Sequence, residues 1–272
     1  MQFLPYHPDF DHLALNVFEA AKLEVHERAT GGQPDSAVLE RAVEDEIAQA
    51  VQRPAVRRLL LRAPRIENLD ALGGNRLETL ILTDAPRIAS LAPLSDCLNL
   101  RTLIVEDCPR LLDIQALSAL ADLKTLRLSG PALGGGWKKI GLAPLSGLTR
   151  LRHLDLAGIR TPDESLTIVA ALPNLEVFDP DGGWPARELA RVAAAHPHLK
   201  GTFLKPLVAS AHFGNTGFFD VDPSKYPPEA ITYMVSGKRG ATDLRPGRDD
   251  ARLARAQERW NAWILESRDR RE

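Results

Sequence analysis

The fold is decided by two consecutive stretches of sequence that share one pattern. Residues 77–99 read LETLILTDAPRIASLAPLSDCLN, and residues 100–122 read LRTLIVEDCPRLLDIQALSALAD. Each stretch begins with a leucine and places aliphatic residues three and five positions later. A Pro-Arg step and a series of spaced apolar residues then follow. Repetition at a fixed period indicates a chain that stacks one small structural unit many times.

The same pattern recurs along most of the chain. Copies of Leu-x-x-Leu-x-Leu, some of them degraded, begin at residues 56, 77, 100, 123, 151, 175 and 199. Successive copies lie 21 to 28 residues apart, which is a steadier period than chance gives. The sequence therefore predicts about seven stacked units, each too small to bury its own apolar edge.

One unit can be read in structural terms from residues 77–99. Side chains alternate in a strand, so Leu80 and Leu82 point toward the core and Ile81 points to the opposite face. Apolar residues then recur every third position from Ile88 to Cys97, a period that suits a 3₁₀-like return segment. Stacking such units predicts a parallel ladder of short strands over a continuous core.

These residues resemble the leucine-rich repeat family. The return segment Leu91–Ser95 recurs as Leu142–Ser146, and this sequence is similar to the internalin-like bacterial subclass. The resemblance implies an α/β leucine-rich repeat solenoid with short parallel strands on the concave face, and with 3₁₀-like turns followed by α-helices on the convex face. One departure is that Pro64, Ala85 and Pro131 stand where the family usually has Asn.

The sequence divides into three predicted segments. Residues 1–55 form a helical N-terminal cap, and residues 56–210 form the leucine-rich repeat solenoid. Residues 211–272 form a C-terminal extension that ends in an amphipathic helix. Caps are expected because the terminal units of a solenoid otherwise expose their apolar core.

Apolar spacing, proline positions and capping residues place the individual elements of these segments. The predicted helices cover residues 11–28, 35–52, 161–171, 185–195 and 248–270, and a short strand is expected near 231–235. The helix over 161–171 rests on a capping box that runs from Thr161 to Glu164. The convex side therefore changes from 3₁₀-like turns to helices toward the C-terminus.

Composition and charge narrow the classes of partner. The net charge of −2 gives no general attraction to nucleic acid or to a membrane surface, so neither partner is expected. Two cysteines, Cys97 and Cys108, are too few for a secreted disulfide framework and lie too far apart along one strand to bond. Without a signal peptide pattern or a long apolar run, we expect a cytoplasmic protein.

The sequence contains no complete catalytic or metal-binding motif, so we expect a protein that is not an enzyme and that uses no cofactor or metal. The run Gly134–Gly136 lacks the Lys-Ser/Thr ending of a phosphate-binding loop. His196 and His198 resemble a metal-binding pair, but His198 aligns with Asn99 and Asn174 and is therefore a repeat position. Asp220–Ser224 lacks the later residues of a calcium loop. The alternative is an enzyme with a site in residues 211–247. It would use residues of that segment, namely His212, Asp220, Asp222 or Tyr226.

The concave strand face is the main candidate for binding a partner. Its predicted middle column and one neighbouring residue supply the candidate contacts, which are Leu60, Ile81, Ile104, Arg127, His153, Asp155, Asp179 and Phe203. The column begins with an apolar row, and an exposed apolar row commonly marks a contact site. The alternative is that a flanking segment folds across this row and covers it.

Two further places carry aromatic and basic residues. The fourth unit is longer than its neighbours because of an insertion that contains Trp137 and Lys138, which is a candidate binding loop. In the C-terminal helix, Trp260 and Trp263 are candidate anchors for a partner. In both places, packing of the tryptophans against the protein's own core is the alternative.

These features lead to a function hypothesis. The sequence predicts a module for protein–protein recognition whose partner is another protein, because solenoids offer rigid and extended surfaces. An intracellular bacterial inhibitor of the immunity or antitoxin type, or an adaptor, are two versions of this hypothesis. A purely structural scaffold is a further alternative.

Overall fold

The protein is described from a computed structural model that covers residues 13–130, 138–180, 183–213, 216–219, 222–236 and 241–269. These residues fall into two units. The first unit is Ala14–Asp179, and the second comprises Pro180–Glu272 together with Met1–Leu13.

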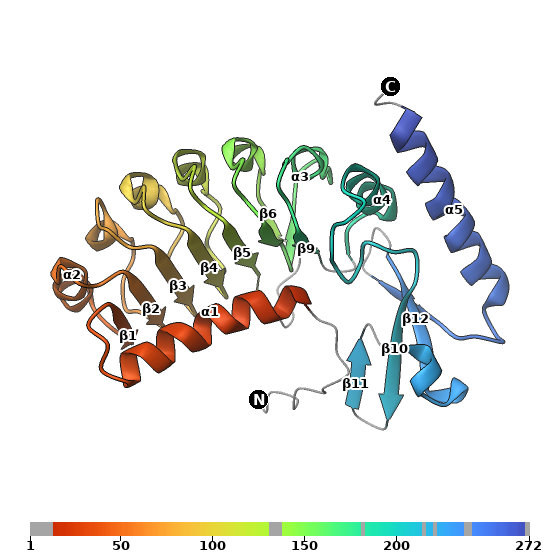
Figure 1. Cartoon of the computed structure of the whole chain (residues 1–272), viewed down its shortest axis with the longest axis horizontal. Helices are drawn as coiled ribbons and strands as arrows, with labels where there is room; N and C mark the ends of the chain where they lie inside the picture. Colours follow the sequence, from red (N-terminus) through yellow and green to blue (C-terminus); the bar gives the residue numbers. More distant parts are fainter. Residues whose placement is uncertain are drawn as a thin grey trace. The chain divides into compact units, whose positions relative to one another are not determined.

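A seven-stranded parallel sheet organises the first unit (Figure 1). Its strands, in spatial order, are β1 (Ser36–Glu40), β2 (Arg58–Arg62), β3 (Thr79–Thr83), β4 (Thr102–Glu106), β5 (Thr125–Ser129), β7 (His153–Asp155) and β9 (Val177–Asp179). The register places Leu60, Ile81, Ile104 and Arg127 directly beside one another on successive strands. The predicted concave column is therefore confirmed from β2 to β9.

Short return segments connect the strands on the other side of the unit. They are η1 (Asp70–Leu72), η2 (Ala92–Asp96), η3 (Gln115–Ala119), η4 (Ala143–Gly147) and α3 (Thr167–Ala170). Leu80 and Leu82 of one unit are buried, as is Leu94 of its return segment. The predicted change from 3₁₀ turns to an α-helix along the convex side is confirmed.

The turn after each strand is held by the backbone, although the family's asparagine is missing. Ala63 and Asp84 follow β2 and β3 with positive φ angles of 46° and 54°. The Ala63 N–H donates to the Thr83 carbonyl at 2.9 Å, and the Asp84 N–H donates to the Glu106 carbonyl at 3.2 Å. Each turn is thereby bonded to the next unit, while Ala85 packs in the core beneath it.

The N-terminal cap differs from the sequence prediction in one element. Residues 35–52 do not form one helix, because residues 36–40 pair with β2 as the extra strand β1 and only α2 (Glu44–Gln52) is helical. Arg41, with φ of 54°, ends the strand. The exposed edge of β2 offers backbone hydrogen bonds that outweigh the local helical pattern.

The C-terminal end of the sheet is also shorter than predicted. The sheet ends at β9, and the expected strand at residues 199–204 is not formed. Phe203 lies in a turn, where the Leu204 N–H donates to the Gly201 carbonyl at 3.4 Å. Gly201 and Pro206 on either side explain this, since both residue types interrupt a strand.

The helix predicted over 161–171 is mostly a turn. Thr161 Oγ1 accepts a hydrogen bond from the Ser165 N–H at 2.8 Å, and Glu164 has a positive φ of 55°. The predicted capping box is therefore wrong, and α3 starts only at Thr167. Next to this turn, β8 (Ile159–Arg160) pairs in parallel with β6 (Lys138–Lys139).

The helix α1 (Leu13–Thr30) lies across the concave side of the sheet in the first unit, over the strands from β1 to β5 (Figure 1). The sequence predicted a helix over 11–28, which agrees within two residues at each end. Its docking on the sheet makes α1 part of the solenoid core.

The second unit combines two helices with a small antiparallel sheet. The helices are α4 (Ala186–Ala195) and α5 (Asp250–Asp269). The sheet has the order β11 (Thr216–Phe219), β10 (Val208–Phe213), β12 (Ile231–Val235) and β13 (Thr242–Leu244), and the short turns η5 (Pro223–Lys225) and η6 (Pro228–Ala230) precede β12. The sequence predicted β12 and both helices, but it missed the other three strands.

Candidate functional site

The concave face of the first unit is covered by α1. Phe18 and Val25 of this helix are fully buried, and they form one apolar cluster with Leu60, Ile81 and Ile104 of the sheet. Phe18 and Val25 stand seven residues apart, two helical turns, so both face the strands. The apolar row is therefore closed by the protein's own helix, as the alternative interpretation of the sequence required.

A cluster of charged groups surrounds Arg127 beside this apolar contact. Arg127 Nη1 lies 3.1 Å from Glu19 Oε1 of α1 and 3.0 Å from Glu106 Oε1 of β4. Arg127 Nε lies 2.9 Å from Asp155 Oδ2, and the guanidinium stands 5.2 Å from the ring centre of Phe18. Arg127 thus joins α1 to three strands of the sheet.

The electrostatics of this cluster keep Arg127 charged. Burial acts to lower the pKa of Arg127, but the carboxylates of Asp155, Glu106 and Glu19 outweigh it and raise that pKa. Lys22 adds a second cation, with Nζ 2.6 Å from Glu106 Oε2. The cluster stabilises the packing of α1 on the sheet, because its ion pairs compensate the charges that α1 covers.

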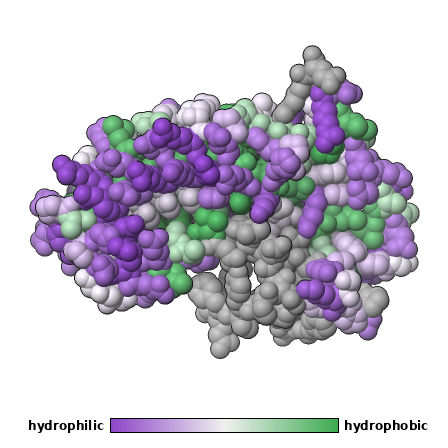
Figure 2. Space-filling view, viewed as in Figure 1, coloured by the Kyte–Doolittle hydropathy of each residue, from purple (hydrophilic) through white to green (hydrophobic). Residues whose placement is uncertain are grey.

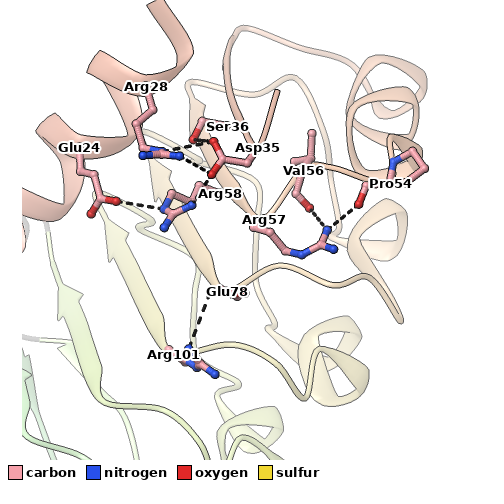
Figure 3. A network of polar contacts seen from close by, with 10 residues as sticks. All are labelled: Glu24, Arg28, Asp35, Ser36, Pro54, Val56, Arg57, Arg58, Glu78 and Arg101. Carbon is pink, nitrogen blue, oxygen red and sulfur yellow. Dashed lines mark hydrogen bonds and ion pairs between the residues drawn. The ribbon is translucent and has the colours of Figure 1, made fainter. Parts of the chain in front are cut away.

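A second polar network fixes the other end of α1 (Figure 3). Arg28 of α1 and Arg58 of β2 both bond the carboxylate of Asp35, at 2.6 Å and 2.7 Å. Arg58 Nε also lies 3.2 Å from Glu24 Oε1 of α1. The hydrogen bond from Arg28 lowers the pKa of Asp35, so this carboxylate stays ionised at neutral pH.

The other predicted contact residues lie outside the apolar row. Asp155 is 1% exposed, and its Oδ1 accepts a hydrogen bond from the Ala157 N–H at 2.8 Å. His153 is half-buried, with Nδ1 3.0 Å from Thr125 Oγ1, and burial lowers its pKa. Asp179 is half-buried on β9, and Phe203 belongs to the second unit. The structure therefore brings Arg127 and Asp155 together within the first unit.

The outward side of α1 carries exposed side chains that a partner can contact, whereas the strands beneath α1 are covered. Figure 2 shows mainly hydrophilic residues, with smaller hydrophobic areas, over α1 and the strands beside it. Leu23 on α1 is 55% exposed, and the side chains of Glu19 and Glu24 are each 54% exposed. Glu19, Leu23 and Glu27 follow one another at four-residue spacing, so they form one stripe, the acidic stripe of α1. Sequence reasoning did not single out this stripe, although a leucine between two glutamates at this spacing is visible in it.

The tryptophan candidates have different outcomes. Trp137 lies outside the described residues, and Lys138 begins β6. Trp260 is 6% exposed and Trp263 is half-buried on α5, which packs against α4. Packing explains most of Trp260, as the alternative interpretation expected.

A pocket of about 480 Å³ lies in the second unit beside these tryptophans. It is lined by Ala186, Pro206, Val235, Ser236, Thr242, Leu244, Arg252, Arg255, Ala256, Arg259, Trp260 and Trp263. Three arginines and both tryptophans come from α5, while Val235, Thr242 and Leu244 come from adjacent strands. The pocket thus has one basic wall and an apolar floor.

The residues proposed for an enzyme have structural roles where they are described. Asp222 caps η5, where its Oδ1 accepts hydrogen bonds from the Ser224 N–H at 3.0 Å and the Ser224 hydroxyl at 2.7 Å. Tyr226 packs against Ala209 and Ile231. His212 lies in β10, and Asp220 lies outside the described residues. Asp222 and Tyr226 therefore act as a turn cap and a packing residue.

Metal-binding clusters and membrane-crossing helices are two further features by which a site can be recognised. Within the described part of the chain, no group of three His, Cys, Asp or Glu side chains has the geometry to hold a metal ion. No helix there combines the length and the apolar character needed to cross a membrane. Both cysteines in that part are unbonded to each other and buried.

The repeat geometry decides the fold class. Each unit contributes one short parallel strand, inward leucines at fixed positions and one return segment. The fold is a leucine-rich repeat solenoid. No family model and no curated protein matches the sequence of this solenoid.

Solved structures of similar arrangement include two internalins of Listeria monocytogenes. Internalin inlF has 17% identity and a TM-score of 0.42, over 68% of this chain and 54% of that one. Internalin C2 (inlC2) has 19% identity and a TM-score of 0.47, over 70% of this chain and 85% of that one. A leucine-rich repeat protein of Leptospira interrogans has 14% identity and a TM-score of 0.37, over 72% and 58% of the two chains. The solenoid thus spans little more than half the length of inlF and of the Leptospira protein.

Proposed function

We propose that this solenoid is a non-catalytic module that recognises another protein on its concave side, through the acidic stripe of α1. The observation that carries the proposal is the closed apolar row beneath α1, combined with the half-exposed Glu19 and Leu23 above it. The concave side predicted from the sequence is kept as the binding side, but its outer layer is the helix and not the strands.

The magnitude of the buried contact favours this outer layer over displacement of α1. Removing α1 would expose Phe18 and Val25 together with Leu60, Ile81 and Ile104 of the sheet. At about 1.5–3 kcal/mol for each fully buried side chain, exposing these five side chains costs roughly 7.5–15 kcal/mol. This is similar to the stability of an entire domain, so a partner binds with α1 in place.

The charge of the stripe suggests the chemistry of the partner. Glu19 and Glu27 flank the exposed Leu23 in the stripe, and Glu27 forms no ion pair among the described residues, which fits a basic protein surface with an apolar depression. This surface fits an inhibitor whose acidic side chain covers the basic site of a partner enzyme. The inhibitor version therefore leads within the proposal.

The test is capture of the partner from native lysate by the tagged full chain, followed by measurement with the purified partner. The double variant Leu23→Arg, Glu27→Arg should lose the partner by more than about tenfold in affinity, because it reverses charge and removes the apolar contact. Its thermal unfolding should stay close to that of the unchanged chain, since both side chains are exposed.

The matched control is Leu98→Arg, which changes an equally exposed leucine, 60% exposed, after return segment η2. It should retain the partner. If the stripe variant binds as well as the unchanged chain, or if Leu98→Arg alone abolishes binding, the concave-side proposal is wrong. The partner's own activity, measured with and without the chain, separates an inhibitor from an adaptor.

A further inference from the structure

The pocket of the second unit has a basic wall, whose charge is opposite to that of the acidic stripe of α1. Arg252, Arg255 and Arg259 stand at three- and four-residue spacing on α5, so their side chains share one side of the helix. Arg252 lies 3.0 Å from Asp249. Among the described residues, Arg255 and Arg259 form no ion pair. Two guanidinium groups are therefore available to an acidic ligand.

This wall is a local concentration of charge on a helix that is balanced overall. α5 contains four arginines and four acidic residues, and three of the four arginines line the pocket. Glu266, by contrast, pairs with Arg187 of α4 at 2.6 Å. The positive side of α5 thus faces the pocket, and guanidinium groups bind carboxylates through paired hydrogen bonds.

The floor of the pocket accepts apolar groups. Val235 and Thr242 stand opposite each other on β12 and β13, and Leu244 lies two positions further along β13. Ala256 and the half-buried Trp263 on α5 continue this surface. A ligand that fits the pocket therefore carries acidic groups on one side and apolar groups on the other.

The length of the basic wall distinguishes a chain of carboxylates from a single anion. Seven residues of helix separate Arg252 from Arg259, which is about 10 Å at 1.5 Å per residue. Alternate side chains of an extended peptide are about 6.6 Å apart and lie on one side, so two or three of them match the wall. One phosphate or one carboxylate reaches only part of it.

The tryptophans argue for a peptide over a single-stranded nucleic acid. Base binding needs exposed aromatic faces on which bases stack. Trp260 is only 6% exposed, and the net charge of −2 gives no general attraction to phosphate chains. The apolar floor fits aliphatic side chains instead.

We propose that this pocket binds an extended acidic peptide segment of a partner protein, with carboxylates on Arg255 and Arg259 and apolar side chains on the floor beside Trp263. The inference rests on the proposed function only in that the chain recognises proteins. It names a second surface with the opposite charge, and a different residue set controls it.

The test is fluorescence anisotropy with the full chain and a fluorescein-labelled nine-residue peptide that alternates Glu with Leu. We expect binding that weakens as NaCl rises from 50 to 300 mM, because each ion pair is screened. The double variant Arg255→Gln, Arg259→Gln should weaken binding by about tenfold or more. The control Arg248→Gln, Arg268→Gln removes two exposed arginines that do not line the pocket, and it should change binding less than twofold.

Further measurements distinguish an acidic peptide from other possible ligands of the pocket. A peptide that alternates Gln with Leu should not bind, and Trp263→Ala should weaken binding of the Glu peptide while circular dichroism stays unchanged. Tighter binding of a labelled ten-nucleotide oligothymidine than of the Glu peptide overturns the proposal in favour of nucleic acid. The proposal is also overturned if the variant Arg255→Gln, Arg259→Gln binds the Glu peptide as tightly as the control Arg248→Gln, Arg268→Gln does. Concentration-dependent self-association that Arg255→Gln, Arg259→Gln abolishes, without peptide binding, assigns the pocket to a second copy and overturns the peptide. The α1 variant should lose the lysate partner but still bind the Glu peptide. The proposal for α1 and the proposal for the pocket can therefore be overturned independently.

Discussion

At the scale of single residues, Arg127 is interpreted differently from the sequence and from the structure. In the repeat it interrupts an apolar column, so it looks like an exposed contact residue. In the fold its side chain is 11% exposed and it pairs with Asp155, which is 1% exposed. A basic residue is needed at this position of the apolar column because α1 brings the carboxylate of Glu19 onto the sheet there.

We predict that Arg127→Met strongly destabilises the chain. The substitution removes the cation beside the buried Asp155, and breaking such a buried pair costs about 3–5 kcal/mol. Since Glu19 is half exposed, we expect the lower end of that range. Urea unfolding followed by circular dichroism measures the change, and Arg127→Met combined with Asp155→Leu should recover part of the loss. A midpoint unchanged by Arg127→Met would contradict the docking role.

His153 supplies a prediction on pH. Burial lowers its pKa from the ordinary value of 6.5, while Glu176 acts against this and Arg152 acts with it. The folded state therefore binds a proton less readily than the unfolded chain does. This contribution to stability is complete above pH 6.5 and declines as the pH falls from 6.5 through the lower pKa of the folded state.

The measurement is the melting temperature of the full chain at pH 7.5 and at pH 5.8. The unchanged chain should lose more on acidification than His153→Gln, because glutamine takes up no proton. The two pH values lie above the range in which carboxylates titrate, so Asp35, whose pKa is lowered, contributes little to the difference. Equal losses in the two proteins would show that His153 binds protons alike in both states.

At the scale of elements, α1 was predictable as a helix but not as a lid. Its apolar residues have helical spacing, and the structure agrees with the predicted bounds within two residues. Where a helix docks depends on residues far away in sequence, here the row of Leu60, Ile81 and Ile104. The sequence left open whether this row contacts a partner or is covered by a flanking segment, and the structure shows that α1 covers it.

We predict that Phe18→Ala costs about 3–5 kcal/mol of unfolding free energy, as large-to-small substitutions of a fully buried phenylalanine do. Leu23→Ala on the same helix should change it by less than about 0.5 kcal/mol, because that side chain is exposed. Urea unfolding of both variants gives the comparison. Similar costs for the two would mean that α1 does not pack on the sheet through Phe18.

Other elements show where local patterns fail. Residues 35–52 have helical spacing, yet residues 36–40 pair with the edge of β2. Phe203 has the right repeat position, yet Gly201 and Pro206 prevent a strand there. Periodicity identified the repeated core units correctly because the same pattern occurs several times, whereas the ends of the sheet depend on edge pairing that occurs once. The basic pocket was missed for a related reason, since packing brings its residues together from several elements, whereas the acidic stripe lies on one helix and is visible in the sequence.

At the scale of the first unit as a whole, α1 changes how the solenoid holds together. In a simple repeat array each unit contacts only its neighbours, so stability is a sum of local terms. Here Phe18 and Val25 touch three successive strands at once, and Arg127 links α1 to β4 and β7. The units from β2 to β7 should therefore unfold together.

The two cysteines give a direct measure of this cooperativity. Cys97 and Cys108 lie before and after β4, are 0% and 2% exposed, and burial raises the pKa of the Cys97 thiol. We predict that a thiol reagent such as DTNB reacts with both at one slow rate at pH 8, equal to the rate of global opening at each urea concentration. Single variants Cys97→Ala and Cys108→Ala assign the two rates. Phe18→Ala should accelerate both to the same extent, since it weakens a contact that all these units share. If one cysteine reacts much faster than the other, or if Phe18→Ala accelerates only one of them, the units open separately and α1 does not couple them.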